Sequence, residues 1–140
     1  MSTLILELKQ NDTMILNGVP IRFCNRVRLE LCAHARFLFG KQIMPPGGDN
    51  TPARRIYYAV QTAYIGTEEE RGPARAAAQR LCDEFAQATT SRTVVHILTE
   101  VMRAVEQDRC YAALKLVCRV MRHEDTVLNV RAPVAEQDAA

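Results

Sequence analysis

Residues 50–61 run Asn50-Thr51-Pro52-Ala53-Arg54-Arg55-Ile56-Tyr57-Tyr58-Ala59-Val60-Gln61, and this stretch decides the fold. It is typical of a helix start, because Asn50 or Thr51 can cap the free N–H groups of the first turn and a proline suits the first helical position. A helical wheel gathers the apolar side chains on one face and places Arg54, Tyr58 and Gln61 on the opposite, outward side. Strand patterns precede this helix and helix patterns follow it, so the sequence predicts an α+β fold.

Five short segments before the helix alternate between apolar and polar residues, and they span 3–8, 13–16, 19–23, 26–32 and 36–39. The pair Asn17-Gly18 is a strong signal for a tight hairpin, and Pro20 favours an edge strand. We expect Phe37 and Phe39 to point into the core. Residues 1–44 are therefore predicted to form a small antiparallel β-sheet or a partial barrel.

The Pro/Gly-rich residues 45–49 form a linker, and residues 50–128 are predicted to form a bundle of about four helices. Gly66 has the position of a C-terminal cap for the first helix. Thr67 and Glu70 match a capping box, but Gly72-Pro73 interrupts the pattern, so we expect a short turn and a new helix from Pro73. Two further helices are expected to begin at Ser91 and at a capping Asp108. We expect one compact unit with a flexible tail over 129–140.

Composition indicates a globular chain, with 140 residues, 48% hydrophobic content and a net charge of +2. Residues 1–44 carry six basic residues against three acidic ones, so the excess of positive charge lies in the β part. The five cysteines are an odd number without a C-x-x-C pair, which favours free thiols in a reduced, cytoplasmic protein and no metal site. No signal peptide and no apolar run long enough to span a membrane is visible.

Catalytic chemistry has no support in the sequence, which lacks a G-x-S-x-G elbow, a phosphate loop and an H-E-x-x-H motif. We therefore expect no enzyme and no cofactor. Nucleic-acid binding has better candidates, because single-stranded RNA is held by cations on its phosphates and by aromatic rings under its bases. The candidate RNA-binding residues are Arg26, Arg28, Arg54, Arg55 and Tyr58.

Arg54 and Tyr58 have a second interpretation, in which they pack against the β part and join the two halves of the chain. We expect Arg54 to contact RNA and Tyr58 to pack. Lys115, Arg119 and Arg122 form a basic stripe on the outside of the last helix. This stripe is either an ordinary solvated helix face or a partner-binding surface for phosphate or for an acidic protein.

Residues 18–66 resemble the flagellar biosynthesis repressor family FlbT. The resemblance is concentrated in residues 50–57, with support from Asn17-Gly18 and from Tyr111-Ala112-Ala113-Leu114-Lys115-Leu116, and it covers roughly residues 4–125. Residues 44–49 depart from the polar or acidic linker expected of the family. The resemblance implies a post-transcriptional regulator that binds the untranslated leader of flagellin mRNA and represses translation or promotes decay. The alternative is an adaptor that binds flagellin or a flagellar chaperone or regulator.

The first strands also resemble, over about twenty residues, the carbon storage regulator family of small β proteins that bind messenger RNA as dimers. Short strands with free edges offer pairing sites for another chain. Together these two points predict a possible homodimer.

Overall fold

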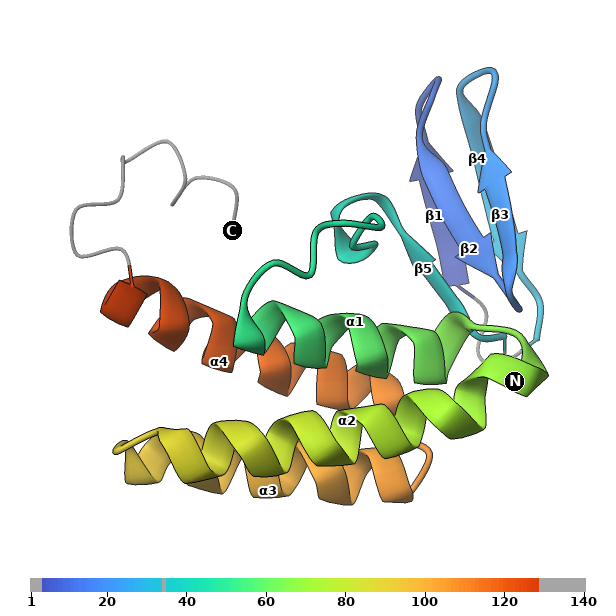
Figure 1. Cartoon of the computed structure of the whole chain (residues 1–140). Helices are drawn as coiled ribbons and strands as arrows, with labels where there is room; N and C mark the ends of the chain where they lie inside the picture. The colour runs from blue at the N-terminus through green and yellow to red at the C-terminus, as the bar shows by residue number, and fades with distance from the viewer. Residues whose placement is uncertain (1–3, 34, 129–140) are drawn as a thin grey trace.

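The computed structural model describes residues 4–33 and 35–128, and the expected tail over 129–140 lies outside them. Five strands lead into a 3₁₀ turn and four helices within the described residues (Figure 1), which confirms the predicted α+β fold. The elements are β1 Leu4–Leu8, β2 Thr13–Leu16, β3 Val19–Arg22, β4 Val27–Leu31, β5 Phe37–Phe39, η1 Gly40–Gln42, α1 Pro52–Ile65, α2 Glu68–Ala88, α3 Arg92–Glu106 and α4 Cys110–Leu128.

The strands form two sheets. β1 and β4 pair as an antiparallel two-stranded ribbon, while β2 lies between β3 and β5 in a three-stranded antiparallel sheet. Asn17 and Gly18 have φ values of 50° and 84°, as a type I′ hairpin turn requires. Pro20 lies in β3, which is an edge strand as predicted.

The face of β5 that meets the helices was predicted wrongly by one residue. Leu38 is fully buried and belongs to the helical core, whereas Phe37 and Phe39 lie on the opposite face and stack with ring centroids 6.4 Å apart. A strand with alternating side chains can present either face to its neighbour, and a shift of one residue exchanges the faces. The alternation therefore identified the strand but not the side that the helices cover.

α1 begins as predicted, because Thr51 Oγ1 accepts a hydrogen bond from the Arg54 N–H and Pro52 occupies the first turn. It also ends as predicted, with Gly66 as its C-terminal cap. Gly66 has an extended backbone, with φ −71° and ψ 173°, and a Cβ atom there would lie 2.5 Å from the Thr62 carbonyl oxygen. Close approach of the chain, rather than a positive φ, requires glycine at this position.

The predicted helix start at Pro73 was wrong, since α2 runs without a break from Glu68 to Ala88. Thr67 and Glu70 form a complete capping box, and three glutamates occupy the first turn. Pro73 lies in the second turn, where its ring removes one backbone hydrogen bond. The capping box and the burial of Ala74, Ala78 and Cys82 offset that loss.

The main core lies between the helices. α1 packs against α2 and α4, and α3 packs against α4 and α2, so that two layers of two helices enclose the apolar cluster (Figure 1). β5 contacts α1 and, together with Ile15 of β2, joins the β part to the bundle. No helix in the described ranges is both long and apolar enough to cross a membrane.

Candidate nucleic-acid interface

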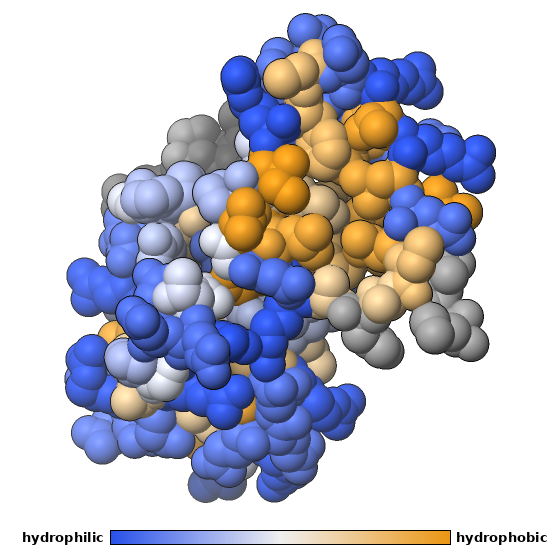
Figure 2. All heavy atoms as spheres, turned by 90° about the vertical axis from the view of Figure 1, so that its right-hand side faces the viewer, coloured by the Kyte–Doolittle hydropathy of each residue, from blue (hydrophilic) through white to orange (hydrophobic). Residues whose placement is uncertain are grey.

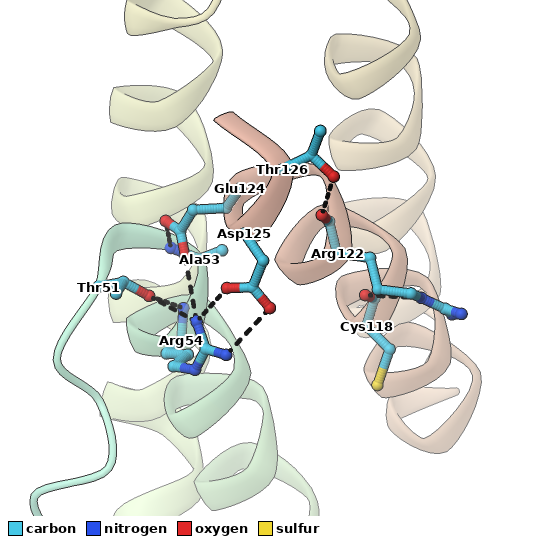
Figure 3. Close-up of polar contacts among 8 residues, drawn as sticks. All are labelled: Thr51, Ala53, Arg54, Cys118, Arg122, Glu124, Asp125 and Thr126. Atoms are coloured by element: carbon cyan, nitrogen blue, oxygen red, sulfur yellow. Dashed lines mark hydrogen bonds and ion pairs between the residues drawn. The ribbon is translucent and has the colours of Figure 1, made fainter. Parts of the chain in front are cut away.

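The start of α1 is held by the end of α4 (Figure 3). The Ala53 N–H donates a 2.8 Å hydrogen bond to Glu124 Oε2, and the Glu124 side chain is almost fully buried. The first N–H groups of a helix have no partner within the helix, and they attract negative charge. Glu124 therefore supplies a carboxylate at the position where α1 needs an acceptor.

Arg54 extends the same connection between α1 and α4. Its guanidinium donates to both carboxylate oxygens of Asp125, at 3.0 and 3.3 Å, and Nη1 lies 3.5 Å from Glu124 Oε1. The two-pronged contact matches the planar geometry of both groups. Arg54 thus lies in an ion-pair cluster between two helices, with its side chain 27% exposed. Its role in RNA binding remains a prediction.

The outward face of α1 is narrower than the helical wheel predicted. Gln61 was expected to face water, but it is 5% exposed. Its side chain accepts from the Met44 N–H at 2.7 Å and donates to the Met44 carbonyl at 3.0 Å. The segment before the linker folds back over α1. The spacing of apolar residues in the α1 sequence does not reveal this long-range contact. Arg55 is exposed and Tyr58 is half-buried on the side of α1 that remains.

Arg26 and Arg28 lie at the β1–β4 ribbon, and both are exposed. Arg28 is the register partner of Glu7 on β1, so a carboxylate lies on the neighbouring strand of the same face. Cross-strand neighbours of opposite charge attract one another. The positive charge that the sequence assigned to the β part is therefore partly offset around Arg28.

Lys115, Arg119 and Arg122 are all exposed on the outer face of α4, at the spacing of one helical stripe. The Lys115 Nζ atom lies 5.1 Å from the ring centroid of Tyr111, whose side chain is 40% exposed. The acidic residues of α4 are Glu124 and Asp125, and both are engaged by α1. The stripe consequently presents three cations beside an accessible aromatic ring.

The candidate residues lie on three elements rather than in one cluster. Arg54 reaches the end of α4, one turn beyond Arg122, but the Arg122 side chain points away from Arg54 (Figure 3). Arg122 Nε instead donates to the Cys118 carbonyl at 3.4 Å. Arg26 and Arg28 lie at the ribbon, which pairs with neither helix.

Sequence reasoning missed a second polar cluster, in which Arg36 joins the β part to the helices. Arg36 Nη2 donates to both oxygens of Asp108 at 2.7 and 2.8 Å, and Nη1 donates to the Tyr64 carbonyl at 3.2 Å. Arg75 also donates to Asp108, at 2.9 Å. Hydrogen bonding to Arg36 holds the pKa of Asp108 below its usual range.

Asp108 was expected to cap the last helix, but α4 begins at Cys110. The Asp108 carboxylate instead forms ion pairs with Arg36 and Arg75. Residues 36 and 108 are 72 positions apart, so no local spacing connects them. The one local signal is that Asp108 lies just beyond Gln107, the C-terminal cap of α3, in a left-handed conformation with φ 57°. Such a position is common at a turn and does not reveal a distant partner.

The described cysteines are free, as predicted. Burial raises the pKa of the Cys82 thiol to about 12 and also raises the pKa of Cys110 and Cys118. These three thiols stay protonated at neutral pH and act as small apolar side chains. Among the residues that the structure describes, no group of three or more His, Cys, Asp or Glu side chains is placed to hold a metal ion.

Comparison with known proteins agrees with the resemblance in the sequence. The family described as "Flagellar protein FlbT" matches residues 4–128. A protein of Mesorhizobium japonicum called "Probable flagellum biosynthesis repressor protein FlbT" is 29% identical over 119 residues, which cover 83% of this chain and 78% of that protein. Proteins of the same name from Rhizobium leguminosarum bv. trifolii and Allorhizobium ampelinum are 26% and 29% identical, and each match covers 91% of this chain and 85% of the relative. No solved structure matches. Because the family match extends over nearly the whole described chain, this protein belongs to the FlbT family of flagellar proteins.

Proposed function

We propose that this protein regulates flagellin synthesis after transcription, by binding the untranslated leader of flagellin mRNA and repressing translation or promoting decay. Support for a regulatory role comes from the relatives, which are named as probable repressors of flagellum biosynthesis. Support for RNA comes from the surface of α4.

The observation that carries the RNA proposal is the stripe of Lys115, Arg119 and Arg122 next to Tyr111. Both acidic residues of α4 are committed to α1, so the stripe keeps an excess of positive charge. Cations that neutralise phosphates supply most of the affinity for single-stranded nucleic acid. A half-exposed tyrosine at one end can stack with a base.

The remaining predicted RNA contacts lie on other elements than this stripe. Arg26 and Arg28 at the ribbon, and Arg55 and Tyr58 on α1, are accessible enough to contact a bound strand. Arg54 contributes chiefly by holding α1 against α4, because its guanidinium is bound to Asp125.

A titration of nuclease-treated protein against flagellin leader RNA tests the proposal. The salt dependence for a single strand has a log–log slope of about −0.7 per neutralised phosphate, so three to five contacts predict a slope of roughly −2 to −4. The triple variant K115Q/R119Q/R122Q should weaken binding and reduce the slope by roughly 2. The matched control is R80Q/R92Q/R103Q, which removes the same charge from exposed positions of α2 and α3.

Equal losses of RNA affinity in the two triple variants would mean that only the net charge of the protein matters, and would contradict an RNA-binding site on α4. Wild-type protein without measurable affinity for the leader at low salt would contradict RNA binding altogether.

A second candidate function, an adaptor that binds flagellin or a flagellar chaperone, is favoured by a groove between α2 and α3. Cys82, Ala86, Val95, Leu98 and Met102 provide its apolar lining. Amphipathic partner helices bind in such grooves. A stoichiometric complex with flagellin in the absence of RNA, abolished by Val95→Glu, would support the adaptor. A leader affinity that Val95→Glu leaves unchanged would locate RNA binding elsewhere.

A further inference from the structure

A hollow of about 710 Å³ lies where distant parts of the chain meet, and this volume is within the range of small-molecule sites. The β2–β3 hairpin, the residues before β5, the α1–α2 junction and the turn between α3 and α4 all contribute to its wall. The side chains that give the wall its chemistry are those of Asn17, Arg36, Tyr64, Glu68, Arg71 and Asp108. We call this site the junction hollow.

Hydrogen bonds between these parts of the chain hold the wall of the junction hollow in place. Asn17 Oδ1 accepts from the Arg36 N–H at 3.0 Å, and the Asn17 N–H donates to the Arg36 carbonyl at 2.7 Å. The Arg36 guanidinium in turn donates to the Tyr64 carbonyl and to both carboxylate oxygens of Asp108. The hollow is therefore largely pre-formed, as ligand sites usually are.

The junction hollow has more positive than negative charge around it. Asp108 pairs with Arg36 and Arg75, and Arg71 adds a third guanidinium whose charge acts on the same carboxylate. Even with Glu68 on the wall, three positive charges stand against two negative ones. Within residues 4–33 and 35–128, the Arg71 side chain makes no hydrogen bond and no ion pair. Its planar set of donors is therefore available to a phosphate.

The wall also offers the groups that a nucleic-acid base requires. Arg36 Cζ lies 5.8 Å from the centroid of the Tyr64 ring, so a guanidinium and an aromatic ring lie together. Unpaired bases stack on both kinds of surface. Because Asn17 Oδ1 is bound to Arg36, the Asn17 side chain keeps its amide N–H groups as donors, and Glu68 supplies an acceptor. Such a mixed lining suits a nucleotide better than a bare anion.

The junction hollow leads toward the basic stripe of α4. The rings of Tyr64 and Tyr111 have centroids 6.3 Å apart, and Lys115 Nζ lies 5.1 Å from the Tyr111 ring. Figure 2 views the molecule from the side of the α1–α2 junction, where hydrophobic side chains gather over the β part and the helices below are largely hydrophilic. A charged strand that reaches the hollow is therefore expected to follow the helices.

We propose that the junction hollow binds one unpaired nucleotide of the RNA strand that lies along the stripe, an inference that rests on the proposed function. The phosphate binds Arg71, and the base packs on the Arg36–Tyr64 pair. Asn17 and Glu68 contact the edge of the base. Sequence-specific proteins usually recognise single-stranded RNA through bases that are splayed out in this way. The stripe contacts phosphates alone, so the hollow adds a preference for one base.

Titration of leader RNA against variants of the whole chain tests the role of Arg71. Arg71→Gln should weaken binding by roughly five- to tenfold and reduce the log–log salt slope by about 0.7, because one phosphate contact is lost. Arg80→Gln is the matched control, since it removes the same charge from an exposed position of the same helix. The control should stay within about twofold of wild-type affinity, because distant exposed charges are screened. Equal losses in the two variants would overturn the proposal.

Substitutions at Tyr64 test the contact with the base. Tyr64→Leu should lower leader affinity by roughly five- to a hundredfold, because the base loses its aromatic platform. Tyr64→Phe keeps the ring and should retain the affinity of wild type. Both variants keep the backbone carbonyl that accepts from Arg36, and their melting temperatures show whether they are folded during the titration. Equal leader affinities of the two folded variants would contradict a base on Tyr64.

Ultraviolet crosslinking of wild-type protein to leader RNA gives a readout that needs no substitution. Crosslinks are expected at Tyr64 as well as at Tyr111, and crosslinks confined to α4 would overturn the proposal. Free nucleoside monophosphates should bind far more weakly than the leader, and equal affinity would mean that the hollow serves a free nucleotide instead. If K115Q/R119Q/R122Q weakens leader binding while Arg71→Gln does not, the proposed function stands and the nucleotide site falls.

Discussion

The backbone N–H of Ala53 donates to the buried carboxylate of Glu124, which lies 71 residues further along the chain. This contact helps to join the start of α1 to the end of α4. It also gives a structural role to the stretch that dominates the sequence. Thr51 caps α1, Pro52 fits its first turn, Ala53 binds Glu124 and Arg54 binds Asp125.

Replacing Glu124 should destabilise the fold. Glu124→Ala leaves the Ala53 N–H without its acceptor and opens space in a buried site, so we expect the free energy of unfolding to fall by about 2–4 kcal/mol. Glu124→Gln keeps an oxygen acceptor and should cost less. Urea denaturation measures both, with the exposed Glu106→Ala as a control that stays within about 0.5 kcal/mol of wild type. Equal stability of Glu124→Ala and Glu106→Ala would contradict this role.

Arg54 and Arg55 are neighbours in the sequence, but their replacement by alanine should change stability by different amounts. Arg54→Ala removes the ion pairs to Asp125 and Glu124 and leaves a buried carboxylate without its cation, so unfolding should become easier by about 1–3 kcal/mol. Arg55 is exposed, and Arg55→Ala should change stability by less than about 0.5 kcal/mol.

Leader affinity distinguishes the two interpretations of Arg54. At a temperature where both variants are fully folded, we expect Arg55→Ala to weaken RNA binding at least as much as Arg54→Ala. An unchanged melting temperature for Arg54→Ala, combined with a large loss of affinity, would instead show that Arg54 contacts RNA directly.

The parts of the fold that sequence predicted are those with local causes. The Asn17-Gly18 turn, the edge position of Pro20 and the Thr51 cap each depend on residues within one turn or one hairpin. The start of α2 also has a local cause, but the proline in its second turn was weighed more heavily than the complete capping box. The stabilisation from the capping box and from the buried face of α2 is larger than the free energy lost with one backbone hydrogen bond.

The rest depended on contacts between distant residues. A helical wheel considers only the residues of one helix, and it therefore placed Gln61 outward. In the structure, the Met44 backbone folds back over α1 and binds the Gln61 side chain. The alternation in β5 did not reveal that Leu38, rather than Phe37, meets α1. The commitment of Arg54 to α4 likewise required the fold, because Asp125 has no recognisable spacing from it.

Acid should weaken the connection between the β part and the helices through Asp108. Its pKa is lowered in the folded protein, so its contribution to stability is present above the pKa of the unfolded chain, about 3.9. This contribution is lost as the pH falls through the folded value. Because the Asp108 side chain is 51% exposed, the contribution at neutral pH should be roughly 1 kcal/mol or less.

Denaturation of wild-type protein and Asp108→Asn across pH 2–7 measures this contribution. The difference in unfolding free energy should be largest near pH 7 and should shrink toward zero at the acid end. A difference that stays constant over the whole range would show that the carboxylate charge is not what Arg36 and Arg75 recognise.

Alanine at Gly66, in the junction between α1 and α2, should destabilise the protein. A Cβ atom at Gly66 would lie 2.5 Å from the Thr62 carbonyl oxygen and 3.3 Å from the Glu70 Cβ atom. Backbone is the nearest obstacle, so the junction must shift, and we expect Gly66→Ala to cost about 1–3 kcal/mol. Thermal unfolding measures the change, and a Gly66→Ala protein as stable as wild type would contradict the close approach at the end of α1.

Alanine at Gly72, only six positions further on, should have a much smaller effect on stability. Gly72 lies inside α2 directly before Pro73, and apart from its two chain neighbours and the helix's own backbone a Cβ atom there would meet no heavy atom within 4 Å. Alanine loses less conformational entropy than glycine when a helix forms, but a Cβ atom on the residue before a proline disfavours the helical backbone. Because these two effects oppose each other, Gly72→Ala should stay within about 1 kcal/mol of wild type. The same thermal unfolding experiment, run beside Gly66→Ala, gives the answer directly. If Gly72→Ala destabilises the protein as much as Gly66→Ala, the open surroundings of residue 72 in α2 would be contradicted.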